Sequence, residues 1–129
     1  MDTSALHIFV GWTAALFGTL AGAFIGLFFH QDSWAGGYAS FRRRMLRLGH
    51  ISFFGIGFLN ILLGLTLGAT ALPAANLEIA SVALIVAVIA MPACCFLAAW
   101  QAQLRHLFPL PVLAVLAGVT AIITGLLSS

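Results

Sequence analysis

Four apolar runs, each about as long as a membrane-spanning helix, follow one another in this chain with short polar connections between them. A spanning α-helix needs about 20 mainly apolar residues. The runs cover approximately residues 6–29, 46–72, 77–103 and 110–127. Long apolar runs indicate helices, because a helix satisfies its own backbone hydrogen bonds inside lipid. The chain is therefore predicted to be an all-α integral membrane protein with four transmembrane helices.

The low content of charged residues supports the same class. Only 6% of the 129 residues are charged, and 63% are hydrophobic. A soluble domain carries about 25% charged residues, so this chain has too few polar side chains to cover a water-facing surface. The length suits a single domain over residues 1–129. Because basic residues are few and mostly confined to one segment, we expect no binding to nucleic acid.

The arginines predict the orientation of the helices. All five lie in the first and third connections, four of them in the segment FRRRMLR, whereas Asp2 and Glu78 lie toward the other end of the runs. Cytoplasmic connections are enriched in basic residues, and short connections favour antiparallel neighbours. We therefore predict an up-down-up-down bundle with both termini on the extracytoplasmic side, in a bacterial inner membrane.

Small residues mark the faces on which these helices are expected to pack, since helices in lipid associate by close backbone approach. Glycines recur on one side of each of the first two runs: Gly11, Gly18, Gly22 and Gly26, then Gly57, Gly64 and Gly68. At about 100° per residue, His50 falls on the glycine side of the second run. Asn60 falls at the edge of that side, about 15 Å deeper in the membrane.

Three histidines, His30, His50 and His106, are expected at the cytoplasmic ends of the helices, while His7 lies alone near the outer end of the first run. Imidazoles can ligate haem iron or copper, and a histidine can also hold a quinone carbonyl. The ordinary alternative is a histidine at the membrane interface, which suits His30 and His106 best. His50 is the strongest candidate ligand because it lies on the packing face.

Asn60, Cys94 and Cys95 are the other candidates for chemistry within the runs. An amide in hydrocarbon is costly unless it is paired, so Asn60 either bonds to another helix, the favoured interpretation, or contacts a cofactor. The adjacent cysteines point about 100° apart and cannot form an ordinary disulfide. With Met91 they offer soft ligands for Cu(I), although filling of apolar space is the favoured role.

A four-helix bundle with interface histidines resembles cytochrome b561-type proteins and the membrane anchor subunits of quinone oxidoreductases. The resemblance rests on His30, His50 and His106, and it implies a haem b or quinone site on the cytoplasmic side. The paired outer histidines that would hold a second haem are missing. Small multidrug exporters depend on a glutamate in their first helix, and the first run here contains no acid.

The leading hypothesis is a small membrane subunit of an electron-transfer or bioenergetic complex, with His50, His30 and His106 as ligands to haem iron or copper and Asn60 as a further cofactor contact. Haem b is the first candidate cofactor, ahead of quinone and copper. No nucleophile set or phosphate loop is present, so we expect an accessory subunit rather than an enzyme. The expected partners are lipid and either other membrane subunits or a second copy.

Two alternatives belong to other classes. The first is a small dimeric transporter or channel with a path along Asn60, Thr66, Cys94 and the glycine faces. The second is a purely structural scaffold subunit, in which every histidine is replaceable and only bulky changes at the packing glycines matter.

Overall fold

The computed structural model describes residues 1–128, which fold into four long helices without any strand. The long helices are α1 (Thr3–Leu27), α2 (Phe41–Ala69), α3 (Ala74–Trp100) and α4 (Pro109–Leu127). Two short 3₁₀ helices, η1 (Trp34–Gly36) and η2 (Ala102–Leu107), lie in the first and third connections. All four spans are long and apolar enough to cross a membrane. The prediction of an all-helical chain with four helices that could span a membrane is confirmed.

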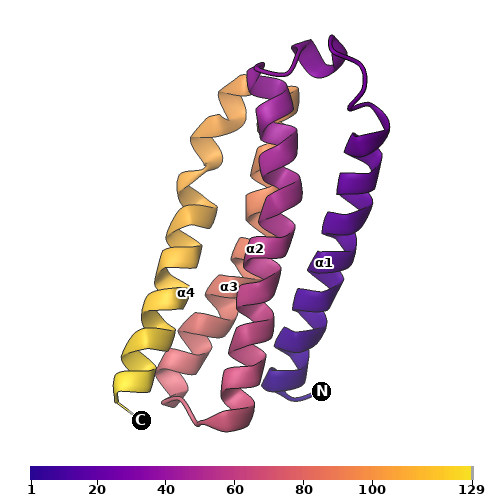
Figure 1. The fold of residues 1–129 in the computed structure, drawn as a ribbon. Coiled ribbons are helices and arrows are strands. Elements are labelled where there is room, and N and C mark those ends of the chain that lie inside the picture. The colour runs from indigo at the N-terminus through magenta and orange to yellow at the C-terminus, as the bar shows by residue number, and fades with distance from the viewer. Residues whose placement is uncertain (129) are drawn as a thin grey trace.

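The four long helices lie side by side and pack mainly in chain order, α1 on α2, α2 on α3 and α3 on α4 (Figure 1). α1 also touches α3 over a short stretch. The beginning of α1 and the end of α4 lie at one end of the molecule, together with the connection between α2 and α3 (Figure 1). The connections that carry η1 and η2 lie at the opposite end, which we call the arginine end because Arg42, Arg43, Arg44, Arg47 and Arg105 belong to it.

The helix ends follow from local hydrogen bonding and differ by a few residues from the predicted bounds. α2 begins at Phe41, so the helix continues from the predicted span at residues 46–72 back to Ser40, as expected for this run, because the Ser40 side chain accepts a hydrogen bond from the Arg43 backbone N–H at 3.1 Å. This cap lets the arginine-rich turn join the helix. α3 ends at Trp100, before the predicted residue 103, because the backbone of Gln101 is extended.

Glycines bring α1 and α2 into close contact. A Cβ atom added at Gly57 would lie 3.0 Å from the Cβ of Ala14, and one added at Gly64 would lie 2.7 Å from the Ser4 carbonyl oxygen. The Ser4 hydroxyl also donates a hydrogen bond to the Gly64 carbonyl at 2.7 Å. These glycines therefore belong to the packing face, as predicted.

The same prediction is wrong for Gly26 and Gly68, where an added Cβ atom would meet open space. Gly68 lies one turn beyond Gly64, which already faces Ser4 near the beginning of α1. The neighbouring helix therefore ends before it can cover Gly68. Periodicity places a residue on a face, but it does not say how far the partner helix extends along that face.

The interior contains two apolar clusters, and large apolar side chains also cover the outside. The first cluster is Leu63, Leu72, Ala80, Leu84 and Ala121, and the second is Ala14, Ile56, Ala87 and Val88. Exposed apolar side chains such as Phe9, Leu62 and Ile89 surround them. An exterior of this kind suits contact with lipid rather than water.

Candidate functional site

A polar network joins three helices in the interior of the bundle. His7 from α1 and Asn60 from α2 are both 0% exposed, and Ser81 from α3 completes the network. Nδ1 of His7 lies 2.8 Å from Oδ1 of Asn60, and Nε2 of His7 lies 2.8 Å from the Ser81 hydroxyl. His7 therefore has no histidine partner here, and its bonds to an amide and a hydroxyl were not predicted.

The hydrogen-bond partners of Asn60 determine the direction of its bond to His7, and the neutral form of the ring determines the direction of the bond to Ser81. Its Nδ2 donates to the carbonyls of Ile56 at 3.0 Å and Leu84 at 3.3 Å. Because carbonyls only accept, Oδ1 faces His7 and accepts from its Nδ1–H. Nε2 of His7 then accepts from the Ser81 hydroxyl. The neutral imidazole satisfies the whole network.

This arrangement confirms the predicted interhelical hydrogen bond of Asn60. It corrects the predicted burial of the Asn60 side chain. Asn60 was expected at the edge of the packing face, but it is fully buried. The helical wheel considered the glycine side of α2, which faces α1, whereas α2 also packs on α3. Its buried sector is wider for that reason. The cofactor contact of Asn60 stays a prediction, and the polar atoms of its side chain are already bonded within the chain.

His50 is held differently, with one nitrogen bonded and the other free. Its Nδ1 lies 2.7 Å from the carbonyl oxygen of Gly18 on α1. Because that oxygen accepts, Nδ1 carries the proton and Nε2 of the neutral ring carries the lone pair. No hydrogen bond to Nε2 occurs among residues 1–128. The half-buried ring therefore presents an acceptor nitrogen in a defined orientation.

Two neighbours fix the His50 ring from its sides. It lies against Gly22 so closely that a Cβ atom there would be 2.9 Å from Nδ1 and 3.0 Å from Nε2. The ring of Phe54 meets it edge to face, with centroids 5.4 Å apart and an interplanar angle of 89°. Histidines that ligate a metal usually donate the other ring N–H to a carbonyl or carboxylate in this way.

His30 and His106 do not join His50 in the described structure. His30 lies in the connection after α1 has ended at Leu27, and His106 lies in η2, and both are exposed. Within residues 1–128, no group of three or more histidine, cysteine, aspartate or glutamate side chains is placed to hold a metal ion. The three-histidine haem or copper site stays a prediction. Of the three histidines, only His50 is packed between helices.

Arg43 is a buried cation that the sequence analysis considered only as an orientation signal. It is 2% exposed. Nη2 donates to the Phe29 carbonyl at 3.1 Å, and Nη1 donates to the carbonyls of Gln31 and Asp32 at 3.4 Å each. The guanidinium also lies 5.4 Å from the centroid of the Tyr38 ring. Arg43 therefore ties the first connection to α2 and bonds carbonyls that follow the end of α1.

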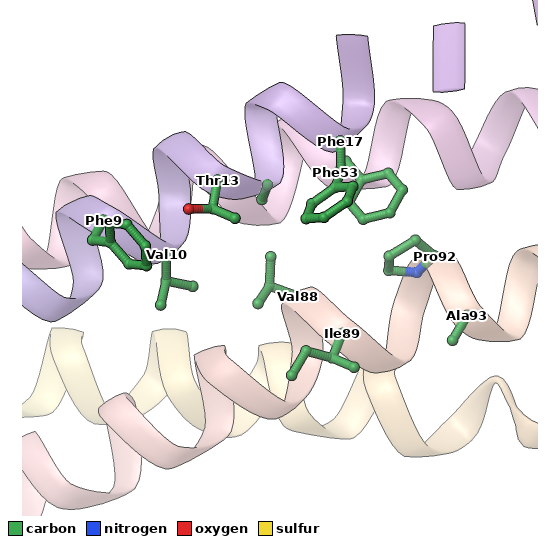
Figure 2. A pocket seen from close by; sticks show the side chains of 10 residues that line it. Phe9, Val10, Thr13, Phe17, Phe53, Val88, Ile89, Pro92 and Ala93 are labelled. Atoms are coloured by element: carbon green, nitrogen blue, oxygen red, sulfur yellow. The ribbon is translucent and has the colours of Figure 1, made fainter. Parts of the chain in front are cut away.

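An apolar groove runs between α1 and α3 over α2, and it contains a cavity of about 390 Å³ (Figure 2). Phe9 and Phe17 come from α1, Phe53 from α2, and Val88 and Pro92 from α3 (Figure 2). Thr13 is the polar residue of the lining. Because proline has no N–H, the Val88 carbonyl lacks its usual helical donor beside this cavity.

The two cysteines fill space between helices. Both are free and buried. Cys95 is 0% exposed, and its Cβ would lie 3.1 Å from a Cβ atom added at Gly49 of α2. Cys94 Sγ makes a weak hydrogen bond to the Leu107 carbonyl at 3.8 Å. These contacts favour the predicted packing role over a copper site.

No family model matches this chain, and no curated protein or solved structure matches it either. Two polar centres stand out, the closed His7–Asn60–Ser81 network and the open His50 imidazole. Of these two centres, only His50 offers a nitrogen that a ligand can use.

Proposed function

We propose that this protein is a small membrane subunit of an electron-transfer assembly, in which Nε2 of His50 ligates the iron of a haem b. The hydrogen bond from His50 Nδ1 to the Gly18 carbonyl, at 2.7 Å, carries this proposal. It holds the ring in the tautomer that leaves Nε2 free, which is the form a metal ligand requires. Haem bound there would supply one-electron transfer.

The surroundings of His50 suit a planar apolar ring. Gly22 brings no side chain toward the imidazole. Phe54 and Phe58 follow His50 on successive turns of α2, with their ring centroids 6.1 Å apart. Aromatic surfaces allow a macrocycle to approach closely, and Gly22 lets the imidazole itself pack against α1. A quinone is the second candidate ligand, because Nε2 can accept a hydrogen bond from a quinol hydroxyl. Copper has less support, because the described residues provide no group of ligands around His50.

A single histidine supports a role as a subunit rather than as an independent electron carrier. His30 and His106 are exposed, and no hydrogen bond joins either to His50. We infer that a partner subunit or a second copy would supply a further ligand to the iron. We also propose that the helices cross a bacterial inner membrane up-down-up-down, with the arginine end in the cytoplasm.

A structural scaffold is the second candidate function, favoured by the closed His7–Asn60–Ser81 network. This network uses its polar atoms to join α1, α2 and α3 and leaves Asn60 no free group for a transported substrate. A transport path along Asn60, Thr66 and Cys94 has no comparable support.

Absorption spectra test the haem proposal directly. The full chain, purified with its co-purifying partners in mild detergent, is recorded oxidised and then reduced with dithionite. We expect a Soret band and sharp reduced α and β bands that His50→Ala abolishes and that exposed His106→Ala retains. Circular dichroism checks that both variants keep their helices. A wild-type sample without haem in the pyridine haemochrome assay would overturn the haem assignment. A fully coloured His50→Ala variant would overturn the role of His50.

A further inference from the structure

Positive charge is concentrated at one end of the molecule. The arginine end carries all five arginines with one acid, Asp32, whereas Asp2 and Glu78 belong to the opposite end. Arg43 is buried, and its hydrogen-bond partners are backbone carbonyls. Arg42 and Arg44 are exposed and available to an external anion. Anionic groups at the membrane surface are attracted to such juxtamembrane clusters.

The groove between α1 and α3 extends toward this arginine end. A second apolar cavity, of about 280 Å³, is lined by Ala21 and Phe24 of α1, Leu46 of α2 and Phe96 of α3. These residues continue the same helix faces that line the larger cavity in Figure 2. The ring of Phe53 links the two cavities, because its centroid lies 6.2 Å from those of Phe17 and Phe96.

Arg42 lies at the arginine end, on the face of α2 that lines the smaller cavity. It lies one helical turn before Leu46, and residues four apart share a face of a helix. Trp34 of η1 lines the cavity at the same end, and the Arg43 guanidinium lies 5.7 Å from the centroid of its ring. An exposed cation therefore lies on the helix face that lines the smaller apolar cavity, and the larger cavity follows along the same helices. The acyl chain of a lipid can fill these apolar cavities, whereas a free inorganic anion has no apolar part to place there.

We propose that the groove between α1 and α3 binds an anionic phospholipid. One acyl chain lies over Leu46 and Phe53, and the headgroup phosphate contacts Arg42. Guanidinium groups bind phosphate through paired N–H donors. Charge complementarity favours an anionic phospholipid over a zwitterionic one, and the apolar groove favours a lipid over inorganic phosphate. The proposal rests on the groove and on Arg42, and it does not depend on the proposed haem.

Native mass spectrometry of the full chain in detergent tests this proposal by counting retained lipids. The probes are phosphatidylglycerol and phosphatidylcholine with identical acyl chains. We expect wild-type protein to retain one phosphatidylglycerol, and to prefer it over phosphatidylcholine at least about fivefold. This ratio corresponds to about 1 kcal/mol, the contribution of one arginine near an anionic membrane surface. Equal retention of the two lipids would overturn the proposal. Displacement by millimolar inorganic phosphate would indicate a free-anion site and would overturn it as well.

Matched variants separate a defined site from general attraction. Arg42→Gln should remove most of the preference, whereas Arg44→Gln, which removes the same charge outside the face of Leu46, should retain most of it. Ala21→Phe should fill the smaller cavity and reduce retention, and Ala23→Phe, at an exposed position of α1 outside the groove lining, should not. Equal losses in both arginine variants, or in both phenylalanine variants, would show that lipid binding is not directed by the groove.

Discussion

The imidazole of His7 and the amide of Asn60 meet in the interior with Nδ1 2.8 Å from Oδ1, although the two residues belong to different helices. Both side chains are fully buried. Removing one partner of a buried hydrogen bond leaves the other unsatisfied, at a cost of about 1–3 kcal/mol. In membrane interiors the measured coupling averages about 0.6 kcal/mol. This pair therefore links α1 to α2, and mutation of either residue should change the free energy of unfolding by a measurable amount.

We predict that Asn60→Leu lowers the free energy of unfolding by about 1–3 kcal/mol, because His7 and the Leu84 carbonyl both lose a partner. Unfolding with a denaturing detergent, followed by circular dichroism, measures the change. Thr19→Val is the control, since the exposed Thr19 hydroxyl bonds only within its own helix, to the Ala15 carbonyl. A double-mutant cycle with His7→Phe should give a positive coupling energy. Additive losses would show that the two side chains contribute independently.

A second prediction concerns the contact between α1 and α2. Gly57→Ala should destabilise the protein, because the new methyl group would lie 3.0 Å from the Gly11 carbonyl oxygen and force the helices apart. Gly68→Ala adds the same atom in open space. It should be neutral or stabilising by up to about 1 kcal/mol, the helix propensity difference. The same unfolding assay compares them. Equal effects would show that close approach at Gly57 does not contribute to stability.

The sequence alone predicted the four helices, because an apolar run of about 20 residues in such a chain can cross lipid only as an α-helix. It also predicted that Gly57, Gly64 and His50 face the interior, since periodicity on one helix determines a face. Contacts between helices were harder to predict. Ser81 reaches His7 only because α3 packs on α2 beside α1, and periodicity does not give helix order.

Arg43 shows a second limit of the sequence. The cluster from Arg42 to Arg47 is typical of an orientation signal, and nothing in its pattern says which arginine turns inward. Arg43 does so because Ser40 caps α2 and the first connection folds back over the helix, which brings three carbonyls to one guanidinium. That geometry depends on the conformation of the connection.

The buried guanidinium leads to a third prediction. Arg43→Gln should lower the free energy of unfolding by about 3 kcal/mol, since hydrogen bonds to charged groups contribute about 1.5–3 kcal/mol each. It should also increase amide hydrogen exchange in the first connection. Arg43→Lys should restore little, because an ammonium group cannot reproduce the planar fork of donors. Arg44→Gln, at an exposed position, is the control. Unchanged exchange in Arg43→Gln would contradict the tethering role.

The last prediction tests the orientation of His50 without changing its chemistry. In Gly22→Ala, the added methyl group would lie 3.0 Å from Nε2 and must displace the imidazole from the Gly18 carbonyl. We therefore expect this variant to lose the haem spectrum as fully as His50→Ala does, while its circular dichroism stays helical. Gly26→Ala adds a methyl group one turn away in open space and should keep the spectrum. If Gly22→Ala retained full colour with an unshifted α band, the ring position enforced by Gly22 would not matter for ligation. Loss of colour in both glycine variants would mean that added bulk on α1, rather than the placement of His50, prevents binding.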